Sequence, residues 1–252
     1  MNKQETLFNY ILRIADSQLI LGHRLSEWTG HGPMLEEELA SANTALDLIG
    51  QANSLYAYAT QVEGKGRTED DLAYLRSERE FFNHLLSEQP RGDFGFSMLR
   101  QMLCDAFDVL FYSALMKSSD NTLSGIAAKA YKESQYHLRH SSSWTERLGD
   151  GTEESHQRMQ NSLNELWRFT DDLFAMRAAD LELVNTGIAV DTSSFREAWF
   201  KQVSDVLERA TLTIPTHAFM QKGSLEGRHT EHLGYLLAEM QSLHRAIPGV
   251  KW

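Results

Sequence analysis

The sequence predicts a mainly α-helical protein, and two observations carry that prediction. The chain of 252 residues contains only four prolines, and none lies between Arg91 and Ile214. Because proline breaks helices and also marks turns between short strands, a chain of this size built from strands would need more of it. Apolar residues also recur at the 3.6-residue period of a helix, and no convincing alternating stretch of β-branched residues occurs. Two sets show the helical period: Phe8, Ile11, Leu12, Ala15, Leu19 and Gly22, and Leu39, Ala42, Leu46, Ile49, Asn53 and Tyr56.

Helix-starting and helix-ending residues then give the order of the elements. The first helix ends in the Gly-His-Gly-Pro turn at 30–33, and the second ends before a Gly-Lys-Gly segment. Thr68 and Thr152 can cap the third and sixth helices, with acidic residues behind them. Pro90 ends the third helix, and the glycines at 149–151 end the fifth. The expected helices run about 4–28, 35–61, 69–87, 95–117, 121–147, 152–170, 195–210 and 226–246, with a less regular stretch at 184–194.

Four of these helices are long and form two tightly joined pairs. The pairs are 4–28 with 35–61 and 95–117 with 121–147, and the connection between them contains its own helix. Two helical hairpins joined by a crossover are one known form of four-helix bundle. Since no internal repeat or low-complexity linker divides the chain, we expect a single domain over residues 1–252, a four-helix bundle with additional C-terminal helices.

The charge balance and the single cysteine exclude several classes of function. Lys and Arg number 24 and Asp and Glu number 35, so the formal net charge is −11. An acidic surface repels phosphate backbones and anionic headgroups, so neither nucleic acid nor membrane is an expected partner. The N-terminus has no secretory pattern, no apolar run could span a membrane, and Cys104 has no second cysteine to pair with. A cytoplasmic location is therefore expected.

A ferritin-like bundle that holds two metal ions sets a demanding pattern. Two helices each supply a carboxylate and two supply Glu-x-x-His, whose spacing places both side chains on one helix face. The motifs must also lie in mid-helix, because the metal ions lie deep in the bundle. Glu-x-x-His occurs at Glu153/His156 and at Glu226/His229, in each case in the first turn of a predicted helix. The helix dipole favours acids there, so we expect N-terminal acids rather than metal ligands. His232, three residues after His229, completes a histidine pair that is expected to be solvated.

The mid-helix positions supply an incomplete set of metal ligands. The set comprises three carboxylates and one inward-facing imidazole: Asp16, Asp47, Asp105 and His137. Gly50 stands where the histidine that belongs with Asp47 is required, and Ser134 stands where the glutamate that belongs with His137 is required. Two dications would have too few ligands and too little negative charge. We therefore expect hydrogen-bonded core residues, such as Asp paired with His or Arg, rather than a metal site.

Four segments carry a resemblance to one family. They are Leu25–Pro33, Ala45–Ala52, Tyr136–His156 and Gly227–Met240. In combination they resemble the structural, non-catalytic subunits of bacterial phenylacetyl-CoA monooxygenases (ring-1,2-epoxidases), and the resemblance covers nearly the whole chain. It implies a ferritin-like four-helix bundle with additional C-terminal helices.

The resemblance also implies where the chemistry takes place. In that family a homologous sister subunit holds the di-iron centre and binds phenylacetyl-CoA, and the complex also contains a further small subunit. A reductase with flavin and an iron–sulfur centre supplies electrons from NADPH, and the ring is epoxidised in aerobic phenylacetate breakdown. The chain itself is then expected to hold no cofactor and to have no catalytic residue. Its vestigial di-metal positions would be Asp16, Asp47, Gly50, Asp105, Ser134 and His137.

Three hypotheses remain open from the sequence. The chain is a scaffold that stabilises and positions a catalytic partner, or an active di-iron oxygenase subunit with atypical ligands, or a helical protein with no oxygenase role. The scaffold hypothesis predicts a broad apolar face that the partner covers. The C-terminal part, 152–252, is one candidate docking region.

Overall fold

A computed structural model describes residues 2–216, 218–247 and 249 of the chain. Over these residues the secondary structure consists of α-helices, short 3₁₀ helices and turns, with no strand. The predicted all-α fold is confirmed, and it is a ferritin-like helical fold. No helix within the described ranges is both long enough and apolar enough to cross a membrane.

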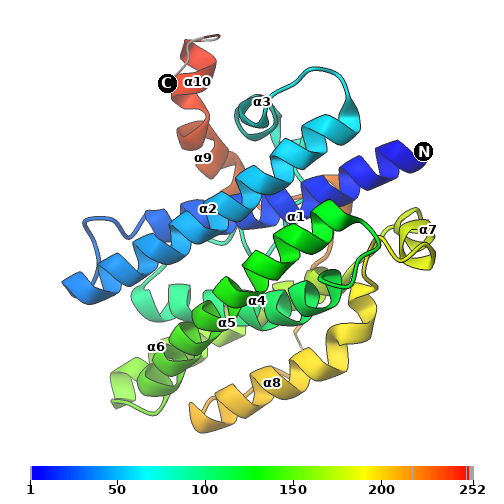
Figure 1. The fold of residues 1–252 in the computed structure, drawn as a ribbon. Helices are drawn as coiled ribbons and strands as arrows, with labels where there is room; N and C mark the ends of the chain where they lie inside the picture. The colour runs from blue at the N-terminus through cyan, green and yellow to red at the C-terminus, as the bar shows by residue number, and fades with distance from the viewer. Residues whose placement is uncertain (1, 217, 248, 250–252) are drawn as a thin grey trace.

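Four long helices form the bundle: α1 (Lys3–Ser26), α2 (Leu35–Glu63), α4 (Phe94–Leu115) and α5 (Asn121–Gly149). α1 packs along α2, and α4 packs along α5, as the two predicted hairpins require. In Figure 1, α2 and α5 lie in front, with α1 and α4 behind them. Hydrogen bonds from Trp144 to Glu37 and from Gln51 to Glu133 place α2 and α5 side by side and antiparallel.

Local sequence signals explain where these helices begin and end. The side chains of Asn2, Asp93 and Asp120 each accept a hydrogen bond from a first-turn backbone N–H of α1, α4 and α5, respectively. Such caps satisfy donors that have no partner within the helix. α2 ends at Gly64, whose φ of 68° is the left-handed conformation that glycine adopts without strain.

The helix expected near 69–87 is wrong over most of its length. Thr68 forms the predicted cap, a capping box with Asp71, but α3 spans only Glu69–Tyr74. The 3₁₀ helix η1 (Glu78–Glu80) and irregular, mostly buried backbone follow as far as Pro90. Side chains of other elements satisfy this backbone: Phe82 N donates to Asp16 (2.9 Å) and Leu85 N donates to Asp172 (3.1 Å). Buried polar backbone of this kind is tolerated only when it is paired.

The C-terminal part adds short helices around the bundle. They are α6 (Glu153–Leu166), η2 (Trp167–Phe174), α7 (Asp180–Asn185), η3 (Thr192–Phe195), α8 (Arg196–Arg209), η4 (Ser224–Glu226), α9 (Glu231–Met240) and α10 (Ser242–Ala246). Thr152 caps α6 as predicted, although the helix tightens into η2 before residue 170. The expected helix 226–246 is wrong at its start and its middle. Gly227 has a φ of 64°, which ends η4, and Gln241 interrupts the helix while its side chain donates to Ala73 O and Arg76 O.

Of the residues whose period predicted the second helix, only Tyr56 is buried. Leu39 and Leu46 are 56% and 67% exposed. The buried face lies one residue earlier along the helix, at Ala45, Leu48, Ala52 and Leu55, and packs against α1. α2 therefore carries two apolar stripes, of which the chain itself covers one.

Candidate functional site

Asp16 of α1 is fully buried and is held by groups from three other segments. The Arg76 guanidinium donates to both of its carboxylate oxygens, and the Tyr56 hydroxyl donates to Oδ1 (2.6 Å). Phe82 N donates to Oδ2. Burial lowers the pKa of Arg76, but the Asp16 charge outweighs burial, so this pKa is raised. Arg76 thus occupies the position beside Asp16 that a metal ion would need.

Asp47 and His137 form a pair between α2 and α5. His137 Nε2 lies 3.1 Å from Asp47 Oδ2, and the His137 side chain is buried whereas that of Asp47 is 41% exposed. Burial lowers the pKa of His137 despite the hydrogen bond to Asp47. In the neutral imidazole, Nε2–H donates to Asp47, and Nδ1 is a buried acceptor that has no partner in the structure. The inward orientation predicted for His137 is confirmed.

Asp105 of α4 contacts Ser141, which lies one turn of α5 after His137. Ser141 Oγ donates to Asp105 Oδ2 and Gln101 Nε2 donates to Oδ1, both at 2.7 Å. Ser141 Oγ also lies 2.9 Å from the backbone oxygen of His137. Burial raises the pKa of Asp105 well above its usual range, although these hydrogen bonds oppose the shift. The predicted burial of Asp105 is confirmed.

Gly50 and Ser134 stand near these groups without adding a ligand. A Cβ built on Gly50 would meet nothing within 4 Å, so space for a side chain exists there. Ser134 is buried, and its hydroxyl has no hydrogen-bond partner. Asp47 and Asp105 therefore contact neighbouring turns of α5, at His137 and Ser141. Asp16 belongs to a separate ion pair with Arg76.

The donor set does not fit a pair of metal ions. Among residues 2–216, 218–247 and 249, no group of three or more His, Cys, Asp or Glu side chains is arranged to hold a metal ion. The Asp16 carboxylate is already neutralised by Arg76, and the Asp47–His137 pair supplies one oxygen and one nitrogen ligand. A bundle that holds two metals needs about six such ligands.

Sequence reasoning missed four residues of these networks. Arg76, Gln18, Gln101 and Asp108 are all buried and polar. Gln18 Nε2 donates to Asp108 Oδ2 (3.1 Å), and burial raises the pKa of Asp108 to about 7. The position of Asp108, three residues after Asp105 on the same helix, indicates that both side chains share a buried face. No sequence pattern indicated the burial of Arg76, because the helix expected around it does not form.

In the two Glu-x-x-His motifs, only the histidines lie within hydrogen-bond distance of backbone oxygens. His156 Nδ1 lies 2.8 Å from Gly149 O at the end of α5, while Glu153 is exposed. His229 is not solvated as expected: its side chain is fully buried, with Nδ1 2.7 Å from Glu88 Oε2 and Nε2 2.9 Å from Phe81 O. Both ring nitrogens thus face acceptors, which requires the protonated imidazole.

Comparison with known proteins identifies the family. A family model described as "Phenylacetic acid catabolic protein", named for PaaA and PaaC, matches residues 1–252. This chain belongs to the phenylacetic acid catabolic protein family. It is 49% identical over 243 residues to a protein of Escherichia coli (strain K12) that is named as one of the subunits of 1,2-phenylacetyl-CoA epoxidase, and the match covers 96% of this chain and 98% of that relative. The resemblance stated from the sequence is confirmed.

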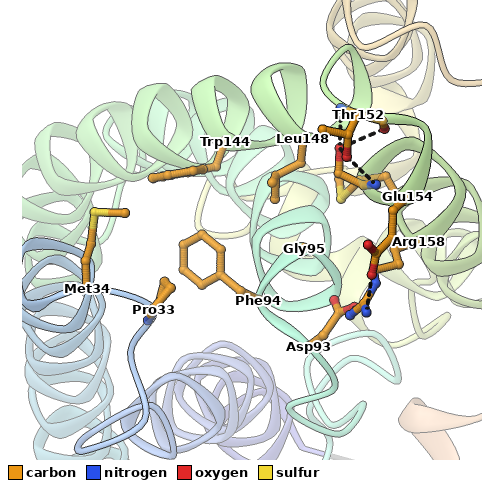
Figure 2. Close-up of a pocket in the computed structure, with 12 residues that line it drawn as sticks. Pro33, Met34, Asp93, Phe94, Gly95, Trp144, Leu148, Thr152, Glu154 and Arg158 are labelled. Carbon is orange, nitrogen blue, oxygen red and sulfur yellow. Dashed lines mark hydrogen bonds and ion pairs between the residues drawn. The ribbon is translucent and has the colours of Figure 1, made fainter.

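This member of the phenylacetic acid catabolic protein family also has a surface pocket of about 480 Å³. Figure 2 shows Phe94 at its centre, with Trp144 and Leu148 on one side and Pro33 and Met34 on another. Phe94 makes an edge-to-face contact with Trp144, whose ring centroid is 5.1 Å away. None of the six candidate metal positions lines this pocket.

Proposed function

We propose that this chain is a structural subunit of a phenylacetyl-CoA 1,2-epoxidase complex in aerobic phenylacetate degradation. It pairs with a homologous subunit that holds the di-iron centre, and it stabilises and positions that subunit. Family membership and the similarity to a subunit of the Escherichia coli epoxidase support the proposal. Phenylacetyl-CoA is then bound and oxidised in the partner subunit.

The observation that carries the non-catalytic role is the ion pair between Asp16 and Arg76. A buried di-metal site brings about four positive charges into the core and needs carboxylates to balance them. Here the carboxylate of α1 is balanced by a guanidinium instead. The glycine and serine at positions 50 and 134 leave the other two motifs incomplete. The di-metal site of this chain is therefore degenerate, and no catalytic residue is assigned to it.

The cofactors of the reaction lie in other subunits under this proposal. The partner holds the two iron ions, and a reductase component with flavin and an iron–sulfur centre delivers electrons from NADPH. The complex also contains a further small subunit. The chain itself holds no cofactor and has neither nucleic acid nor membrane as a partner, in keeping with its net charge of −11.

The test is the iron content of the chain, first alone and then with its partner. The chain is purified from iron-replete cells and assayed for iron, and separately co-expressed with the affinity-tagged homologous subunit of the same organism. We expect a folded helical protein with far less than one iron atom per chain, and co-purification with the tagged subunit. About two iron atoms per chain would instead favour an oxygenase with atypical ligands. Absence of co-purification would contradict the pairing.

A further inference from the structure

The outward stripe of α2, termed here the α2 ridge, is apolar and uncharged. Its positions are Leu35, Leu39, Ala42, Leu46, Ile49 and Asn53, separated alternately by four and three residues. The leucines are 56–68% exposed, Asn53 is exposed, and Ala42 and Ile49 are half-buried. In a chain in which 23% of residues are charged, these six positions span five turns of helix without one charge.

The inner face of α2 has the same spacing and packs against another helix of the chain. Ala45, Leu48, Ala52 and Leu55 follow the same alternation of three and four residues, and α1 packs against them. Apolar positions with this spacing are the seam along which two helices pack. One seam of α2 is filled by α1. The other has the same spacing and its leucines are exposed, although Ile49 also packs beside Gly22 of α1.

The outward stripe of α5, termed here the α5 ridge, is basic. Its positions are Gly125, Lys129, Lys132, Tyr136, Arg139, Ser143 and Arg147, all exposed. Four of these seven are cations and none is an acid, although acids outnumber bases in the whole chain. Lys129 lies 3.4 Å from Glu133, and Arg139 and Arg147 lie over the rings of Tyr136 and Trp144.

Two glutamates between the ridges, Glu37 and Glu133, hydrogen-bond across from one helix to the other. Glu37 accepts from the Trp144 indole N–H (2.7 Å) and lies 2.8 Å from His140 Nε2. Glu133 accepts from Gln51 Nε2 (2.9 Å). These bonds fix α2 and α5 relative to each other, and Figure 1 shows the two helices side by side in front. The result is a surface with an apolar ridge beside a basic one.

We propose that the α2 and α5 ridges form the docking surface for the homologous subunit. That subunit presents an uncharged apolar helix against the α2 ridge and acidic side chains against the α5 ridge. The inference rests on the proposed function and adds to it the surface and the chemistry of its complement. Charge complementarity selects a partner with acids at one side of an apolar helix. An anionic membrane is disfavoured, because the chain as a whole carries a charge of −11.

Point substitutions on the exposed ridge test the surface without disturbing the core. We use Leu46→Arg and Leu39→Arg, with Phe200→Arg as the matched control, since Phe200 is an exposed apolar residue of α8. Binding to the tagged homologous subunit is measured by titration, and circular dichroism checks the fold. Each ridge variant is expected to weaken binding by about 30-fold or more, as central interface residues do, and the control by less than about 3-fold.

A second pair of variants tests the charge of the partner. Lys132→Glu combined with Arg139→Glu should weaken binding and reduce its dependence on salt, because the lost contacts are electrostatic. Lys201→Glu, at an exposed position of α8, is the control and should leave both unchanged. A double variant that binds as tightly as the wild type would overturn the assignment of acids to the partner.

The remaining outcomes separate this inference from the proposed function. If the wild type binds the homologous subunit and the leucine variants bind equally well, the docking surface is wrong and the proposed function stands. If the wild type does not bind, the proposed function fails as well. Self-association that Leu46→Arg abolishes would assign the ridges to a second copy of this chain. Binding to phosphatidylglycerol vesicles that the same variant abolishes would assign them to a membrane, and either result overturns the inference.

Discussion

Arg76 and Asp16 form an ion pair in the core, with the guanidinium donating to both carboxylate oxygens and to the Tyr56 hydroxyl. Sixty residues separate the two partners in the chain. The pair fixes the irregular segment after α3 against α1, and the guanidinium neutralises the Asp16 carboxylate.

Removal of Arg76 is expected to destabilise the fold strongly. Arg76→Met leaves the buried Asp16 carboxylate without its cation, which costs about 3–5 kcal/mol of unfolding free energy. The combined change Asp16→Asn with Arg76→Met removes both charges and should lose less than the single variant. Urea unfolding followed by circular dichroism measures both. A single variant within about 1 kcal/mol of the wild type would show that the pair contributes little.

The contact between His229 and Glu88 should make stability depend on pH. Burial lowers the pKa of His229, but the hydrogen bond and charge of Glu88 outweigh burial and raise this pKa. A raised pKa means that the contribution is fully present below the unfolded value of about 6.5 and is lost as pH rises through the folded value.

This prediction is measured as the difference in unfolding free energy between the wild type and His229→Gln. The difference should be largest at about pH 6 and should shrink towards about pH 9. His232→Gln, at a half-buried position three residues further on, is the control and should show no such trend. A difference between wild type and His229→Gln that stays constant with pH would argue against a protonated His229.

Asp108 should act on stability in the opposite way to a salt-bridged carboxylate. Burial raises its pKa to about 7, so the folded state binds a proton more tightly than the unfolded state. The wild type then loses stability as pH rises from about 4 to about 7, by up to about 4 kcal/mol. Asp108→Asn keeps an acceptor for Gln18 and removes the charge, so it should flatten this loss.

Unfolding free energies of the wild type and Asp108→Asn between about pH 4.5 and pH 8 check the prediction. Asp150→Asn, an exposed acid at the end of α5, serves as the control and should follow the wild type. If Asp108→Asn keeps the wild-type pH profile, Asp108 is not the group that titrates.

Two substitutions should partly rebuild a metal site between α2 and α5. Gly50→His adds an imidazole three residues after Asp47, and a side chain there meets open space. Ser134→Glu adds a carboxylate three residues before His137. With Asp47 and His137, the double variant has about four donors, enough for one divalent ion of modest affinity.

Cobalt(II) titration followed by visible absorption measures this gain. The double variant should bind, and each single variant should bind at least about 10-fold more weakly, because three donors hold a metal poorly. A folded double variant without cobalt bands would show that positions 50 and 134 do not correspond to metal-binding positions.

Residues within one helix could be placed from the sequence. The caps at Thr68 and Thr152 and the burial of Asp105 and His137 follow from spacing within a few residues, and the structure has them as predicted. Such features depend on hydrogen bonds and faces within a single helix, so local residues are enough to determine them.

The tertiary structure alone decided which long-range partners these residues have. Arg76 pairs with Asp16 and His229 with Glu88 across gaps of 60 and 141 residues, and no local pattern encodes such pairings. The same holds for α2, whose two apolar stripes have equal spacing in the sequence. Only the position of α1 determines that Leu48 is buried and Leu46 is exposed, because burial depends on which neighbour a face meets.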